Sequence, residues 1–162
     1  MVLEYALKET KRLKIEPVMQ INSTKFDKTW NSKWKQWLRY YALAFYAAKT
    51  GDVEMFSMQN EPNHKHSGPM KIDIYIDAMK IVSDAIYCAL SDVNKFYGKN
   101  LIPKLVAPVT AGNNVNWWSA VIKSLNVDYR GLPTSRDLIS IFSTHSYNLP
   151  ASELSLIHIS EP

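Results

Sequence analysis

The sequence predicts an α/β protein in which helices alternate with short parallel β-strands. Segments with apolar residues at steps of three and four, the period of a buried helix face, recur along the 162-residue chain. Short apolar runs separate these segments, and their length is typical of buried strands. The order helix, strand, repeated four times, favours parallel strands joined by right-handed helical crossovers.

The first half of the chain predicts two helix–strand pairs. Residues 3–14 are expected to form a helix with Leu3 and Leu7 inward, followed by a strand at 15–21. A second helix is predicted from residues that recur at helical steps: Trp34, Trp37, Leu38, Tyr41, Phe45 and Ala48. Gly51 is expected to cap this helix, and residues 53–59 to form the next buried strand.

The second half predicts two further pairs. A long helix is expected over 72–97, with Gly98 at its C-terminal cap, and a strand at 105–109. Residues 117–125 have the spacing of another helix, and residues 138–143 (LISIFS) that of a fourth strand. Two architectures fit this order: a doubly wound open sheet and a (β/α)₈ barrel. A complete barrel needs about 250 residues, so length alone favours the small open sheet.

Composition excludes several classes of function. The net charge is +4, but the lysines lie among helix-periodic apolar residues and no basic run is present, so no nucleic-acid partner is expected. No apolar run is long enough to cross a membrane. The helical pattern of the first residues is not that of a signal peptide. Cys88, the single cysteine, permits neither an internal disulfide nor a zinc cluster, and no metal or cofactor is predicted.

A carboxylate stands where the second predicted strand ends, in Gln59-Asn60-Glu61-Pro62-Asn63-His64. The carboxyl ends of parallel strands form the functional face of α/β folds. A carboxylate beside an amide suits a general acid near a sugar hydroxyl, and glycoside hydrolysis needs one such group plus a second carboxylate. Glu61 could equally begin an ordinary loop, so this segment alone leaves both interpretations open.

The fourth predicted strand ends in Ser143-Thr144-His145-Ser146-Tyr147-Asn148. His145 and Tyr147 are two residues apart, so both side chains point to the same face of a strand. A strand that grades from apolar to polar toward its carboxyl end is typical of an active-site mouth. Combined with Asn60-Glu61-Pro62, this pattern favours a catalytic or binding site.

With these residues the chain resembles the clan A retaining glycoside hydrolases, which are (β/α)₈ TIM barrels that include cellulases, mannanases and xylosidases. The resemblance implies that Glu61 is the catalytic acid/base and that Asn60 contacts the sugar. It implies that His145 and Tyr147 line the substrate site, and that the four strands are strands 3–6 of a partial barrel, about half of it. The family's nucleophilic glutamate follows strand seven, and no residue here matches it.

Further residues are candidates for substrate contact. Trp30 and Trp117 are aromatic rings in or beside loops at the strand ends, where they could stack on sugars, and His64 could rim the cleft. We therefore expect a fragment of a hydrolase that cleaves β-glycosidic bonds in an oligo- or polysaccharide and is inactive alone. Two alternatives stay open: a glycan-binding pseudoenzyme on the same barrel, and an unrelated open α/β domain.

The last nine residues differ from the rest of the chain. Residues 154–162 (LSLIHISEP) resemble the translation of a sequencing adapter, so the catalytic domain is expected to cover 1–153 only. The sequence does not decide localisation, although polysaccharide-degrading enzymes of this clan are usually secreted.

Overall fold

A computed structural model describes residues 2–21, 33–66, 69–112, 114–124 and 139–145. The helices are α1 (Val2–Arg12), α3 (Lys33–Gly51), α4 (Ile72–Tyr97) and α5 (Val115–Ser124). The strands are β1 (Val18–Gln20), β2 (Met55–Ser57), β3 (Lys104–Ala111) and β4 (Ile139–His145). Each predicted helix and strand is present at its predicted place, with boundaries that differ by a few residues.

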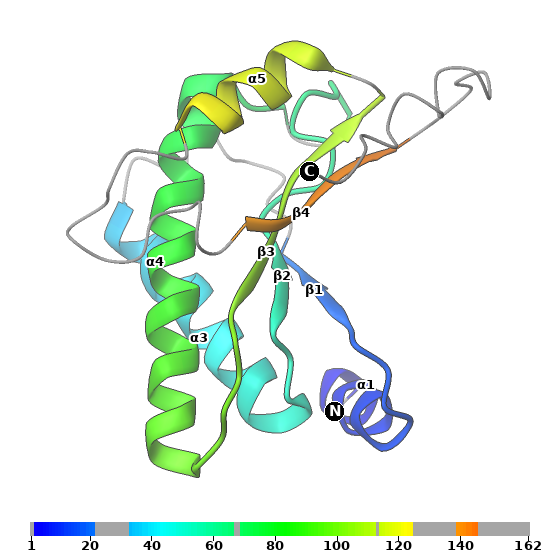
Figure 1. Cartoon of the computed structure of the whole chain (residues 1–162), viewed down its shortest axis with the longest axis vertical. Coiled ribbons are helices and arrows are strands. Elements are labelled where there is room, and N and C mark those ends of the chain that lie inside the picture. Colours follow the sequence, from blue (N-terminus) through cyan, green and yellow to red (C-terminus); the bar gives the residue numbers. More distant parts are fainter. Residues whose placement is uncertain (1, 22–32, 67–68, 113, 125–138, 146–162) are drawn as a thin grey trace, which may run out of the picture.

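The four strands form one parallel sheet in the order β1-β2-β3-β4 (Figure 1). Phe56 of β2 lies between Met19 of β1 and Leu105 of β3, and Ala111 of β3 pairs with His145 of β4. The predicted α/β class with parallel strands is therefore confirmed. Strand order follows chain order, whereas in a doubly wound sheet the order reverses at a switch point.

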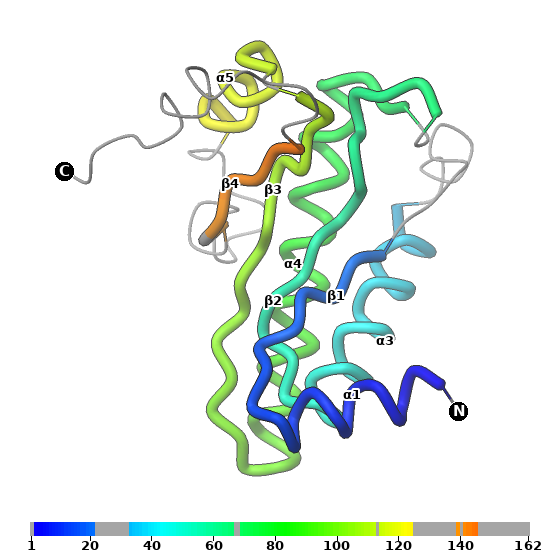
Figure 2. Tube along the Cα trace, turned by 90° about the vertical axis from the view of Figure 1, so that its right-hand side faces the viewer, coloured from blue at the N-terminus to red at the C-terminus, as the bar shows by residue number. Residues whose placement is uncertain are grey.

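The helices α3 and α4 cover the same side of the sheet (Figure 2). Their contact with the strands forms a core that contains Tyr40, Phe56, Met79, Leu90 and Leu105, all less than 1% exposed. Right-handed crossovers between successively placed strands put their helices on one face, which explains this arrangement.

The predicted buried face of α3 is confirmed only in part. Ala48 is buried and Trp37, Tyr41 and Phe45 pack partly buried against the core, whereas Leu38 is 43% exposed. Tyr40, Ala44, Ala47 and Ala48 face the core, while Trp34 is 62% exposed. The aromatic residues form a stacked row beside this face, with Trp34 on Trp37 and Trp37 on Tyr41. Helical spacing predicts the helix correctly, but two adjacent stripes of residues have this spacing. The stripe that contains Tyr40 and the alanines is the more deeply buried one.

Gly51 is the last residue of α3 rather than its cap. The left-handed position is taken by Asp52, with φ 54°, whose amide donates to the carbonyl of Ala48. A Cβ on Gly51 would lie 3.0 Å from the Cβ and carbonyl oxygen of Leu7. Gly51 is therefore needed for the close approach of α1, where Leu7 is buried and Leu3 is 39% exposed, contrary to the prediction for Leu3.

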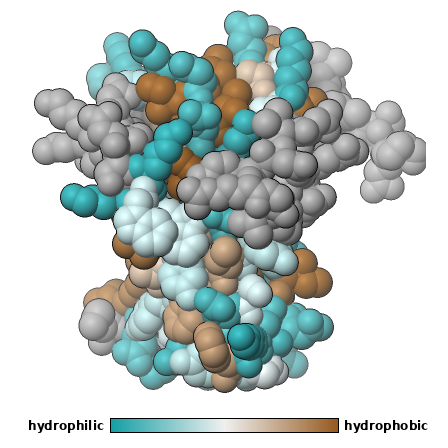
Figure 3. Space-filling view, turned by 90° about the vertical axis from the view of Figure 1, so that its left-hand side faces the viewer, coloured by the Kyte–Doolittle hydropathy of each residue, from teal (hydrophilic) through white to brown (hydrophobic). Residues whose placement is uncertain are grey.

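Figure 3 shows the left-hand side of the molecule in Figure 1, the side on which α4 lies. Hydrophobic and hydrophilic residues are interspersed on this surface. None of the described helices is long and apolar enough to cross a membrane.

Candidate active site

The segment after β2 continues along the end of β3. Asn60 forms an isolated parallel bridge with Val109, and the amide of Glu61 donates to the carbonyl of Val109 at 2.7 Å. On the other side of β3, His145 is paired with Ala111. Glu61 and His145 thus flank the carboxyl end of the same strand, as predicted from parallel topology.

The side chains of Glu61 and His145 meet across this strand end. Nδ1 of His145 lies 2.7 Å from Oε1 of Glu61. The glutamate side chain is 8% exposed and the histidine side chain 30% exposed. Carboxylates are rarely this buried without a partner, and an imidazole at hydrogen-bond distance supplies one.

A tight turn holds Glu61 in an uncommon backbone conformation. Its φ is 44°, a left-handed value that costs a non-glycine residue free energy and often occurs at functional sites. The amide of His64 donates to the carbonyl of Glu61 at 2.9 Å, which closes the turn over Pro62 and Asn63. Proline is favoured in the second position of such turns because its φ is fixed.

Asn63 fastens this turn to β3, a role that sequence reasoning missed. Its side-chain amide donates to the carbonyl of Ala111 at 2.9 Å, and its side-chain oxygen accepts from the amide of Ala111 at 2.8 Å. The amide of Met70 also donates to the carbonyl of Pro62 at 2.8 Å. An Asn directly after Glu-Pro in a turn was the available signal, since Asn side chains readily replace backbone partners in turns.

Hydrogen bonds at the tips of β3 and β4 fix the position of His145. The hydroxyl of Thr144 donates to the carbonyl of Gly112 at 2.7 Å, and the amide of Gly112 donates to the carbonyl of His145 at 2.9 Å. The indole N–H of Trp118 donates to the hydroxyl of Thr110 at 3.3 Å. These contacts connect β3, β4 and α5 behind the Glu61–His145 pair.

His64 lies on the other oxygen of the glutamate. Its Nδ1 is 3.8 Å from Oε2 of Glu61, and its side chain is 44% exposed. The ring of His66 lies 5.4 Å away, centroid to centroid. The structure therefore brings together three predicted site residues (Glu61, His145 and His64), with Asn60 on the adjoining bridge.

Trp117 was predicted to lie at the site, and this prediction is wrong. It is 5% exposed and packs edge-on against Tyr75 of α4, with ring centroids 5.1 Å apart. A buried ring cannot offer its face to a sugar, so Trp117 belongs to the helix-side core. Its position on the inward stripe of α5 explains this burial. Trp30 and Tyr147 lie outside the described residues.

Among the described carboxylates, Glu61 alone stands at the carboxyl end of a strand. The others belong to α1, to α4 or to the segments that lead into β1 and β2: Glu4, Glu9, Glu16, Asp52, Glu54, Asp73, Asp77, Asp84 and Asp92. In this part of the chain no three His, Cys, Asp or Glu side chains are grouped so as to hold a metal ion. The described residues thus place one carboxyl group, that of Glu61, at the carboxyl ends of the strands.

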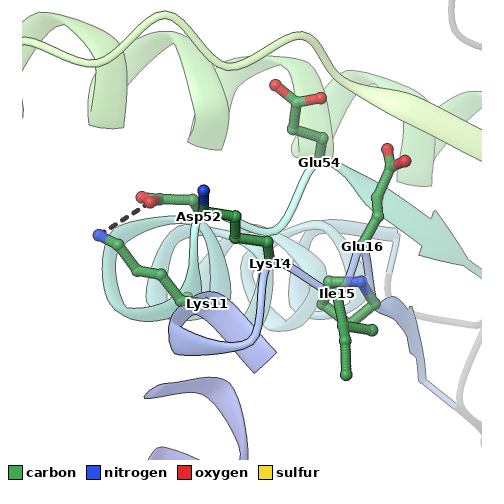
Figure 4. A pocket seen from close by; sticks show the side chains of 8 residues that line it. Lys11, Lys14, Ile15, Glu16, Asp52 and Glu54 are labelled. Carbon is green, nitrogen blue, oxygen red and sulfur yellow. Dashed lines mark ion pairs between the residues drawn. The ribbon is translucent and has the colours of Figure 1, made fainter. Parts of the chain in front are cut away.

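A hollow of about 240 Å³ lies at the opposite, amino end of the strands (Figure 4). Four of the charged residues that line it form ion pairs: Lys11 contacts Asp52, and Glu16 and Glu54 both contact Lys104. Burial raises the pKa of Asp52, but hydrogen bonds from Lys11 and Lys99 outweigh it and hold the pKa below its ordinary value. These pairs give Lys11, Asp52, Glu16 and Glu54 a structural role, and the amino face of α/β folds is usually the stabilising one.

No protein-family model matches the chain, and no curated protein matches it significantly. The assignment of function therefore depends on the geometry around Glu61.

Proposed function

We propose that the chain is part of a retaining glycoside hydrolase that acts on β-linked oligo- or polysaccharides, with Glu61 as the catalytic acid/base. The observation that carries this proposal is the contact between the buried Glu61 carboxylate and His145 at the carboxyl ends of β2 and β4. A general acid must be desolvated, held in one orientation and placed on the functional face of the sheet. Glu61 meets all three requirements.

The strand order supports a partial (β/α)₈ barrel as the architecture. Four successive parallel strands in chain order, with α3 and α4 on the same side, match the repeating unit of that barrel. Catalytic residues in barrels come from the ends of different strands at the carboxyl face, as Glu61 and His145 do here. Under this proposal β1 to β4 are strands 3–6.

The two oxygens of Glu61 then have different tasks. With a proton on Nδ1, His145 donates to Oε1 whether the carboxyl group is neutral or ionised. We assign the catalytic proton to the other oxygen, Oε2. In the first step Oε2–H protonates the departing glycosidic oxygen as that bond breaks, and in the second step Oε2 accepts a proton from the attacking water. Glu61 returns to its initial state after each cycle.

The second carboxyl group of the mechanism has to come from outside the described residues. Retention requires a nucleophile about 5 Å from the acid/base, and no other described carboxylate stands at the carboxyl ends of the strands. The same observation favours a second candidate function, in which the barrel binds glycans without cleaving them. Both candidates place a carbohydrate at Glu61.

The test uses the gene product that contains this chain, assayed on β-glycosides with good and poor leaving groups. Glu61→Gln should lower kcat/KM by about 10²–10⁴-fold for a natural β-glycan, because that leaving group needs protonation. The loss should be much smaller for a 4-nitrophenyl glycoside. Unchanged turnover of the glycan by Glu61→Gln would refute the role of Glu61. Binding of the glycan without hydrolysis by the wild-type protein would favour the binding function.

A further inference from the structure

We propose that the paired hydroxyls of Thr110 and Thr144 position His145 for the reaction proposed above. Both threonines are then positioning residues that act on Glu61 through His145, and the inference rests on the function proposed for Glu61. The two threonines are register partners at the ends of β3 and β4, and their hydroxyl oxygens are 3.1 Å apart. Thr110 is fully buried, so its hydroxyl must find its hydrogen-bond partners inside the protein.

The hydrogen bonds of this hydroxyl pair lead from α5 to the residue that follows β3. The indole N–H of Trp118 can only donate, so the hydroxyl oxygen of Thr110 accepts from it at 3.3 Å. Thr110 donates to the hydroxyl oxygen of Thr144, and Thr144 donates to the carbonyl of Gly112 at 2.7 Å. The same carbonyl is 3.1 Å from the hydroxyl of Thr110. Both hydroxyl protons therefore have acceptors, as buried hydroxyls require.

Gly112 is the point at which the hydroxyl pair reaches His145. Its carbonyl accepts from Thr144, and its amide donates to the carbonyl of His145 at 2.9 Å. Two consecutive residues of β4 thus hold Gly112, one through its side chain and one through its main chain. Gly112 has φ 68°, a left-handed value that favours glycine. These two bonds fix the end of β4 against β3, and with it the direction in which the His145 side chain leaves the strand.

The hydroxyl pair and the acid lie on opposite faces of the strand ends. Successive residues of a strand point to opposite faces, so Thr144 points away from the face on which His145 contacts Glu61. Trp118 of α5 contacts Thr110 on that other face. The hydroxyl pair is therefore not placed to touch a substrate held at Glu61. Its effect on catalysis passes through His145, whose Nδ1 is 2.7 Å from Oε1 of Glu61.

The test compares removal of the Thr144 hydroxyl with its retention, in the gene product that contains this chain. Thr144→Val keeps the branched shape without the hydroxyl, and it should lower kcat/KM on a natural β-glycan about tenfold, the equivalent of one hydrogen bond. It should change kcat/KM on a 4-nitrophenyl glycoside less than about twofold, because this leaving group departs without a proton from Glu61. Thr144→Ser, which keeps the hydroxyl, should retain most of the activity on the glycan.

The imidazole resonances of His145 in NMR spectra report its position independently of activity. Thr144→Val and Thr110→Val should both shift these resonances, because the two hydroxyls belong to one chain of hydrogen bonds. Ser83→Ala is the matched control, since Ser83 is buried within α4 and its hydroxyl donates to the carbonyl of Met79 at 2.8 Å. This variant loses a buried hydroxyl away from the strand ends. It should change neither kcat/KM nor the His145 resonances.

An equal loss on both substrates in Thr144→Val, or unchanged activity on the glycan, would overturn the inference. So would unshifted His145 resonances, or a Thr144→Ser variant as impaired as Thr144→Val. If Thr144→Val does not fold, Thr110→Val and Thr110→Ser make the same comparison at the other hydroxyl. Failure of the underlying function has a different signature: Glu61→Gln would retain full activity on the glycan, while Thr144→Val would still shift the His145 resonances.

Discussion

Glu61 and His145 are 84 positions apart in the chain, yet Nδ1 of the histidine lies 2.7 Å from Oε1 of the glutamate. The contact crosses the end of β3, to which both residues are tied by backbone pairing. Because the two side chains share a largely buried position, the pair should influence stability as well as chemistry.

Replacement of His145 by Ala should lower the free energy of unfolding by about 1–3 kcal/mol, because it removes this partner from a buried carboxyl group. Urea unfolding of the chain measures the change. A double-mutant cycle with Glu61→Gln should give a coupling free energy of at least about 0.5 kcal/mol. Strict additivity of the two substitutions would contradict the contact, and exposed His66 provides a control substitution with no expected effect.

Asn63→Ala should destabilise the chain by about 1–3 kcal/mol and also disturb the site, because the amide and carbonyl of Ala111 lose their partners. Asn94→Ala is a matched control, since Asn94 makes the same two-bond contact with the backbone of Leu101, away from the site. Both variants should lose similar stability in urea unfolding. Only Asn63→Ala should shift the imidazole resonances of His145 in NMR spectra, and equal shifts in both variants would refute the positioning role.

Gly51→Ala should destabilise the chain by about 1–3 kcal/mol, because the new Cβ meets Leu7 at 3.0 Å and packed elements tolerate added volume poorly. Helix propensity alone predicts the opposite sign, a gain of about 0.5–1 kcal/mol. Thermal or urea unfolding distinguishes the two. A more stable Gly51→Ala variant would show that α1 does not pack on α3 as described.

Asp52 should make the free energy of unfolding depend on pH. Its folded pKa lies below the ordinary value of 3.8, despite burial, because Lys11 and Lys99 donate hydrogen bonds to it. The contribution of Asp52 to the free energy of unfolding is therefore complete above the ordinary pKa of 3.8. It is lost as the pH falls through the lower pKa of the folded state. Unfolding free energies measured from about pH 6 to about pH 2 should show a difference between wild type and Asp52→Asn that shrinks with acidification. A difference that stays constant over this range would contradict the ion pairs.

The sequence was sufficient for the order and type of the elements, because buried helix and strand faces leave different periods in the chain. It was also sufficient to place Glu61 and His145 at one edge, since parallel strands end together. It could not choose between the two stripes of α3, because both have helical spacing and only the sheet distinguishes them. Burial of Trp117 likewise depends on Tyr75, which is distant in sequence. The two hydrogen bonds of Asn63 depend on the backbone of β3, which is distant in sequence, so no local pattern predicts them.

The most direct test of Glu61 is chemical rescue of Glu61→Ala in the gene product that contains this chain. A substrate with a good leaving group forms the glycosyl-enzyme without acid assistance, and azide can then displace the enzyme's carboxylate without needing a base. If Glu61 is the acid/base, added azide should restore turnover and give a β-glycosyl azide of retained configuration. Full activity of Glu61→Ala without azide, or an α-glycosyl azide, would contradict the assignment.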